Sequence, residues 1–217
     1  MIHGVGQQHY GWSFSARRRL RVALKLRGRD LWAVEALWAP LADRYETAML
    51  SDAERDGSDG NAAQRLVTGT VADALLYDNN PEFRAEVFAL LDARFAELRR
   101  PPVVFAHSLG CLIVSDYLRS RPAARIAALH SFGDNLGLFW MGRTFDCPAQ
   151  LAVKGVWRDY WTPSDALGYP LKSRPGFEHV TSTRVSVGNW FDRWSGLSHA
   201  AWWDSAKLWS ETIPAYL

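Results

Sequence analysis

Residues 101–119 of the chain read Pro-Pro-Val-Val-Phe-Ala-His-Ser-Leu-Gly-Cys-Leu-Ile-Val-Ser-Asp-Tyr-Leu-Arg. The apolar, β-branched run at residues 103–105 is typical of a buried strand. Three small residues follow it without a spacer, namely Ala106, Ser108 and Gly110, and apolar residues then recur with the period of a helix. The stretch therefore predicts a strand, a tight turn and a helix in direct succession.

The turn itself, Ala-His-Ser-Leu-Gly, has the pattern of a nucleophile elbow with alanine in place of the first glycine. In such an elbow the serine adopts a strained conformation at the carboxyl end of a strand, and its hydroxyl is exposed. Ala106 and Gly110 are small enough to let the neighbouring backbones pass closely. The alternative is an ordinary turn whose serine caps the following helix. We take Ser108 as the candidate nucleophile.

A serine nucleophile needs a base to accept its proton, and a carboxylate to hold that base in one tautomer. In chains with this elbow the order is serine, acid, histidine. Of the six histidines, His199 follows the last predicted strand by about a dozen residues and is the candidate base. A helix-capping or merely exposed histidine is the alternative there. His130 falls inside a predicted strand, where a satisfied core histidine is expected, and His107 belongs to the elbow, pointing away from Ser108.

Several aspartates compete for the role of the acid. Asp165 lies on a turn led by Pro163, which favours a position over the edge of the sheet, and we prefer it. Asp159 is the main rival; it lies closer to the end of a predicted strand, where a salt bridge with Arg158 would explain it. Asp192 and Asp134 are less favoured candidates.

The chain opens with Met-Ile-His-Gly-Val-Gly. A His-Gly pair followed by small residues, directly after a strand, is the arrangement that places a backbone N–H at a developing oxyanion. Only Met1 and Ile2 precede this pair, so the first strand is truncated. We expect that residues are missing before Met1, either because the chain begins late or because the gene start is placed too far downstream. The alternative is a sheet that lacks the first half of this strand.

In the rest of the chain, segments with a strand pattern alternate with segments of helical period. The length of the whole chain suits one domain over residues 1–217. The predicted class is α/β, with a mostly parallel central sheet and helices on both faces. Strands are expected at 31–38, 125–132, 151–157 and 182–187. Helices are expected at 13–27, 41–50, 62–76 and 81–99, with a last one that begins near Ser198 or His199 and runs toward Pro214.

Composition excludes several other classes. A formal net charge of +2 is too small to indicate nucleic-acid binding. The two cysteines, Cys111 and Cys147, fit no metal-ligand spacing, and Cys111 is expected to be a buried small hydrophobe. No apolar segment is long enough for a membrane span, and no signal peptide is visible, so the expected location is cytoplasmic.

These motifs together resemble the α/β-hydrolase superfamily, and within it the lipase- or esterase-like bacterial members. The resemblance rests on the His-Gly-Val-Gly opening, the elbow, the Asp165-Ala-Leu-Gly-Tyr-Pro-Leu loop and the Leu-Ser-His199 segment, and it covers nearly the whole chain. It implies Ser108 as nucleophile, His199 as base and Asp165 as acid. It also implies an oxyanion hole formed by backbone N–H groups of Val5 or Gly6 and of Leu109, with no metal or organic cofactor.

The expected substrate is a carboxylic ester, either a small molecule or a lipid. Trp140, within an apolar stretch at residues 137–146, and Trp202 are expected to line the substrate pocket. An acyltransferase or a thioesterase would use the same triad. A further alternative is a catalytically silent module that binds a partner through the tryptophan-rich carboxyl-terminal part of the chain.

Overall fold

The computed structural model of the chain describes residues 1–4, 8–26, 31–45, 73–136, 156–195 and 198–217. Two compact units can be distinguished. Unit 1 comprises Met1–Gly4, Gly11–Glu35 and Arg100–Leu217, and unit 2 comprises Val5–Tyr10 and Ala36–Arg99. One domain over residues 1–217 stays a prediction, since a domain can contain more than one compact unit.

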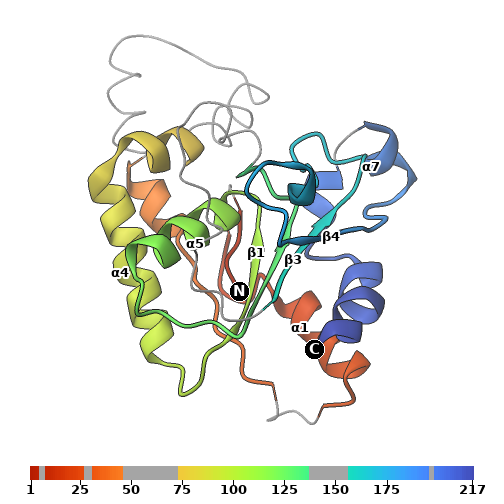
Figure 1. The fold of residues 1–217 in the computed structure, drawn as a ribbon, viewed down its shortest axis with the longest axis horizontal. Helices are drawn as coiled ribbons and strands as arrows, with labels where there is room; N and C mark the ends of the chain where they lie inside the picture. Colours follow the sequence, from red (N-terminus) through yellow and green to blue (C-terminus); the bar gives the residue numbers. More distant parts are fainter. Residues whose placement is uncertain (5–7, 27–30, 46–72, 137–155, 196–197) are drawn as a thin grey trace. The chain divides into compact units, whose positions relative to one another are not determined.

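Unit 1 is built on a four-stranded sheet whose order follows the sequence (Figure 1). All three neighbouring pairs are parallel, and His107, Phe132 and Tyr160 lie side by side across the first three strands. The predicted α/β class with a parallel sheet is therefore confirmed. The strands are β1 (Val103–His107), β2 (Ala128–Phe132), β3 (Val156–Trp161) and β4 (Thr181–Arg184).

The chain start pairs with the free edge of β1. Ile2 forms a single parallel bridge with Ala106, in which its N–H donates to Phe105 O (2.8 Å) and its carbonyl accepts from His107 N–H (3.2 Å). The truncated first strand of the prediction is thus one bridged residue. It is enough to place His3 and Gly4 beside the carboxyl end of β1.

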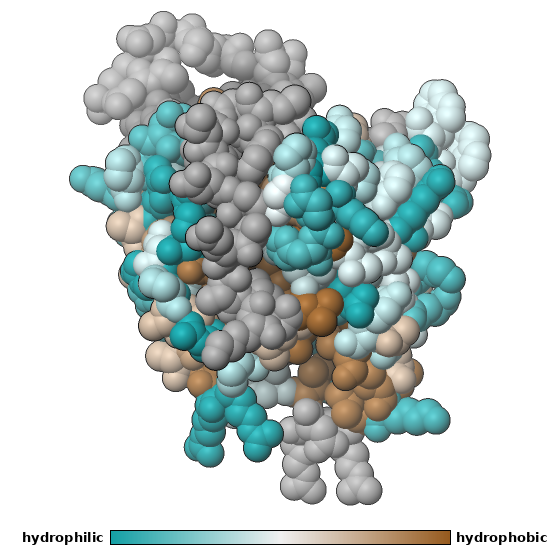
Figure 2. Space-filling model, in the orientation of Figure 1, coloured by the Kyte–Doolittle hydropathy of each residue, from teal (hydrophilic) through white to brown (hydrophobic). Residues whose placement is uncertain are grey.

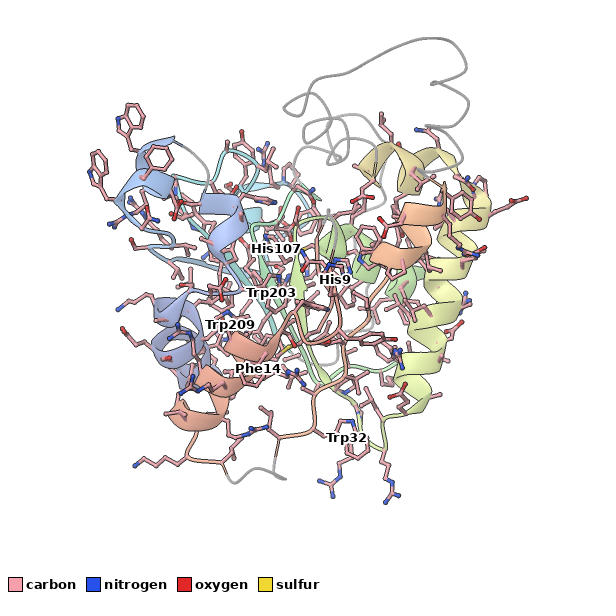
Figure 3. The ribbon with its side chains drawn as sticks, turned by 180° about the vertical axis from the view of Figure 1, so that it is seen from behind. His9, Phe14, Trp32, His107, Trp203 and Trp209 are labelled. Carbon is pink, nitrogen blue, oxygen red and sulfur yellow. The ribbon has the colours of Figure 1, made fainter. Side chains whose placement is uncertain are left out.

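Helices lie on both faces of this sheet. The helix α5 (Leu109–Ser120) follows β1, and its Cys111 is buried on the face that carries Ser131 and Asp159. The opposite face packs against α1 (Phe14–Ala23) and the carboxyl-terminal turns η4 (Lys207–Thr212) and η5 (Ile213–Tyr216). The core on that side comprises Ala16, Leu20, Phe105, Phe132, Tyr160, Val185, Val187, Trp202, Trp203, Leu208, Trp209 and Ile213. Figure 3 shows Trp203 and Trp209 following His107 through the interior of unit 1.

Two predicted elements are wrong. The strand expected at 31–38 is reduced to one bridge residue, Ala36. Its neighbour Glu35 instead accepts hydrogen bonds from the N–H groups of Gly11 (2.8 Å) and Ser13 (3.0 Å), and from the Ser13 hydroxyl. A side chain, in place of a strand ladder, therefore fixes this end of the segment.

The single last helix is also wrong, because three short elements replace it. The 3-10 helix η3 (Ser198–Ala201) comes first, and the π-helical turn η4 and the 3-10 helix η5 follow it. Trp202 lies between η3 and η4, and its carbonyl accepts from Ser205 N–H (3.2 Å) and from Trp209 Nε1 (3.0 Å). These bonds turn the chain at the two tryptophans, so no continuous helical ladder forms.

Unit 2 is helical in its described part, with helices at residues 39–45, 73–79 and α4 (Pro81–Ala96). Pro81 begins α4, and Asn80 Oδ1 caps it by accepting from Phe83 N–H (2.9 Å). This confirms the helix predicted from Pro81. Across the described residues, no helix combines the length and apolar character that crossing a bilayer requires.

Candidate active site

Ser108 occupies the turn between β1 and α5 with backbone angles of φ 51° and ψ −125°. Apart from glycines, only Ser108 and Lys25 have positive φ in the described part of the chain. A residue with a Cβ adopts this region at a cost, so its surroundings must hold it there. Two backbone hydrogen bonds do so: Ser108 N–H donates to Phe132 O (3.2 Å), and Cys111 N–H donates to Ser108 O (2.9 Å).

The side chain of Ser108 begins a continuous chain of hydrogen bonds. Its Oγ lies 2.8 Å from His199 Nε2. The other ring nitrogen, Nδ1, lies 2.9 Å and 3.0 Å from the two carboxylate oxygens of Asp165. The structure thus brings together the three residues that the sequence singled out as nucleophile, base and acid, although they are 34 to 91 positions apart along the chain.

Asp165 is buried and held by four donors. Besides His199, these are Trp202 Nε1 (2.8 Å to Oδ2) and the N–H groups of Leu167 and Gly168 (both 2.9 Å to Oδ1). Burial acts to raise the pKa of this carboxyl, but the hydrogen bonds led by His199 outweigh it, and the net pKa is lowered. Asp165 is therefore a fixed anion at neutral pH.

The rival aspartates have other partners. Asp159, in β3, accepts from Leu171 N–H (3.0 Å) and Ser182 Oγ (2.8 Å), and burial raises its pKa to about 7. Asp134 is buried and accepts from Leu136 N–H, and its pKa is likewise raised, chiefly by burial and then by Asp159. Asp192 accepts from Asn189 N–H. The hydrogen bonds of the His199 ring go to Asp165 and Ser108.

The loop that carries His199 is tied to the loop that carries Asp165. Ser198, buried at the start of η3, hydrogen-bonds Ser164 Oγ (3.0 Å) and the Val187 carbonyl oxygen (3.1 Å). His199 itself remains partly exposed. A reactant therefore has access to the imidazole while its position relative to Asp165 is fixed.

His107 lies beneath the base. Its ring stacks on Phe132, with centroids 5.5 Å apart, and its centroid is 4.8 Å from that of His199. Burial, and then the neighbouring His199, lower the pKa of His107 well below its usual value. A neutral ring at this place adds no positive charge beside His199, the candidate base. His130, as expected, is a satisfied core histidine whose Nδ1 lies 2.8 Å from the Tyr160 hydroxyl.

Three glycines make the site possible by close approach. A Cβ on Gly4 would lie 2.6 Å from Ser108 Cβ. Gly168 and Gly133, the latter with φ +56°, enclose the Asp165 carboxylate, and a Cβ on either would come within 3.0 Å of its Oδ2. Sequence reasoning missed Gly133 and Gly168 as parts of the site, although a glycine three residues after the acid was a visible signal.

The remaining predicted residues are placed as follows. Leu109 is the first residue of α5, and N–H groups in the first turn of a helix have no intrahelical acceptor. Val5, Gly6 and Trp140 lie outside the described residues. Trp202 does not line an open pocket, because its ring is fully buried and its indole N–H donates to Asp165.

Among the described residues, no group of three His, Cys, Asp or Glu side chains is arranged to hold a metal ion. A comparison with protein-family models gives no match to the chain, and a comparison with curated proteins gives none either. The functional argument therefore rests on the geometry of the site.

Proposed function

We propose that the chain is a serine hydrolase of the α/β-hydrolase fold that cleaves a carboxylic ester through an acyl-enzyme. One observation carries the proposal. Ser108 Oγ, the imidazole of His199 and the carboxylate of Asp165 form an unbroken line of hydrogen bonds at a strand-to-helix turn, where Ser108 has a positive φ. A serine within hydrogen-bond reach of a base, and a carboxylate that orients this base, are the requirements of nucleophilic acyl transfer.

In the first half-reaction, Ser108 Oγ attacks the ester carbonyl carbon while its proton passes to His199 Nε2. The tetrahedral intermediate collapses when that proton is given to the oxygen of the leaving alcohol, which breaks the ester C–O bond. Asp165 stabilises the transient imidazolium and keeps a proton on Nδ1. A water molecule then attacks the acyl-enzyme, gives its proton to His199, and releases the acid and Ser108.

Negative charge on the carbonyl oxygen needs donors that are in place before the reaction. The N–H of Leu109 is one such group, since it lies in the first turn of α5 next to Ser108. The resemblance assigns the second donor to Val5 or Gly6. Loss of one oxyanion donor typically costs about 3 kcal/mol of transition-state stabilisation, so both donors are part of the proposal.

The test is hydrolysis of p-nitrophenyl esters of graded acyl length by the wild-type protein and by Ser108→Ala. Ser115→Ala is a matched control, because Ser115 is a buried serine of α5, the helix that follows Ser108, and takes no part in the triad. We expect turnover that is lost in Ser108→Ala and retained in Ser115→Ala.

Labelling with a fluorophosphonate probe separates the alternatives. A thioesterase or an acyltransferase would react with the probe at Ser108 but prefer another leaving group or acceptor. A protein that neither reacts with the probe nor turns over any ester would contradict the proposal, and the silent binding module would then be the better account.

A further inference from the structure

The short helix α7 (Trp190–Ser195) presents three aromatic side chains to solvent. Trp190 is 73% exposed, Phe191 55% and Trp194 75%. Figure 1 shows α7 beyond β4, the edge strand of the sheet, and in Figure 2 this region has the pale colours of near-neutral hydropathy that are typical of tryptophan. Three large rings in water on one six-residue helix are costly, and such a group marks an interaction site.

The three rings form one surface. The indoles of Trp190 and Trp194 are nearly parallel, at 10°, with centroids 6.5 Å apart, and Phe191 lies 6.5 Å from Trp194. We call these three residues the aromatic tip. Because the rings adjoin one another, a partner can contact all of them at once.

The backbone under the aromatic tip is fixed by local polar contacts. Asn189 N–H donates to Asp192 Oδ2 (2.8 Å), and Asp192 N–H donates to Asn189 Oδ1 (3.0 Å). Gly188, with φ +79°, lets the chain turn tightly against Asp192. The one carboxylate of α7 is thus engaged in capping the helix. Arg193, next to the tip, is exposed, and its guanidinium donates to Asn189 O (3.3 Å) and to Ser186 Oγ (3.1 Å).

We propose that the aromatic tip docks the protein on a lipid bilayer with anionic headgroups. Indole and phenyl rings with one wet side favour the headgroup level of a bilayer. The segment that leads from residue 171 through β4 to the end of α7 at residue 195 carries four Lys or Arg and two Asp or Glu, and this excess of positive charge suits an anionic surface. A protein partner would need a pocket shaped to the tip and a further contact area of about 800 Å² per side, whereas a bilayer adapts to a small protruding group.

This proposal concerns binding and does not rest on the proposed function. The test is co-sedimentation with large unilamellar vesicles, made either of phosphatidylcholine alone or of phosphatidylcholine with phosphatidylglycerol. The wild-type protein is expected to bind both, and the anionic vesicles more tightly. Ser108→Ala is expected to bind as the wild type does, so a failure of the catalytic proposal leaves this one testable.

The decisive variant replaces the tip, as Trp190→Ser with Phe191→Ser and Trp194→Ser. It is expected to weaken binding to both kinds of vesicle by at least about tenfold. Arg193→Gln is expected to weaken binding about fivefold on anionic vesicles alone, in a salt-dependent way. The matched control removes exposed aromatics elsewhere in unit 1, as Phe14→Ser with Trp32→Ser, which Figure 3 labels away from α7.

Three results would overturn the proposal. The first is a wild-type protein that binds neither kind of vesicle. The second is a tip variant that binds as well as the wild type while its circular dichroism is unchanged. The third is a concentration-dependent dimer, seen by analytical ultracentrifugation, that the tip variant abolishes. That outcome would assign the aromatic tip to a second copy of this chain.

Discussion

Trp202→Phe isolates the contribution of one hydrogen bond to the candidate triad. The substitution keeps an aromatic ring in the core but removes the indole N–H that donates to Asp165 Oδ2 at 2.8 Å. Oδ1 keeps its bonds from Leu167 and Gly168, so the carboxylate stays in place. Oδ2 retains only the Nδ1–H of His199, which it shares with Oδ1.

The magnitude follows from these contacts. A hydrogen bond to a charged group contributes about 1.5 to 3 kcal/mol, and the low end applies because the other donors remain. That corresponds to about a tenfold fall in kcat. KM for a p-nitrophenyl ester is expected to stay within about twofold, because Trp202 is fully buried and presents no surface to a substrate.

Trp209→Phe is the matched control. Trp209 is also fully buried, and its indole N–H also donates a hydrogen bond, but to the carbonyl of Trp202 and not to the triad. Both variants are expected to lose about 1 to 2 kcal/mol of stability, measured by urea unfolding. Only Trp202→Phe is expected to lower kcat and the rate of fluorophosphonate labelling. If both variants lower kcat equally, the positioning role assigned to Trp202 is refuted.

Three further predictions concern single residues. Gly4→Ala is expected to lower kcat by about tenfold to a hundredfold, because the added Cβ would lie 2.6 Å from Ser108 Cβ and displace the nucleophile; unchanged kinetics in the ester assay would contradict this. Asp165→Asn is expected to lower kcat by about 10⁴-fold, because the amide cannot hold His199 in the required tautomer; a loss of less than tenfold in the same assay would assign the acid elsewhere. Burial raises the pKa of Asp159 from 3.8 to about 7 in the folded protein, so its contribution to stability is fully present below pH 3.8 and is lost as the pH rises through 7. Asp159→Asn is therefore expected to be more favourable relative to the wild type at pH 8 than at pH 4, by at least about 1 kcal/mol in urea unfolding, and equal effects at both pH values would argue against it.

The sequence predicts best where local pattern and tertiary structure agree. Residues 101–119 contain their own strand, turn and helix, so β1 and α5 follow from periodicity and small residues alone. The parallel sheet was equally accessible, because the expected strands are separated by helical segments. The structure also gathers Ser108, Asp165 and His199, whose order along the chain had suggested them.

Features that are set by contacts between distant residues could not be predicted from the sequence. Leu31 to Trp38 is apolar enough for a strand, but the carboxylate of Glu35 is used by Gly11 and Ser13. Trp202 was expected to lie in the last helix and to line the substrate pocket, yet it turns the chain and donates to Asp165. Neither the bonds to Glu35 nor the bond from Trp202 to Asp165 affects the hydrophobic pattern of the sequence, because each joins residues more than 20 positions apart.

The bond between Ser198 and Ser164 has a consequence for how the site comes apart. It joins the loop of His199 to the loop of Asp165, so the two loops form one cooperative unit. Local opening then separates His199 and Asp165 from Ser108 together, in a single step. In hydrogen exchange, the amides of Asp165, Leu167, Gly168 and Ser205 are expected to share one opening free energy, and Ser198→Ala would split it into two.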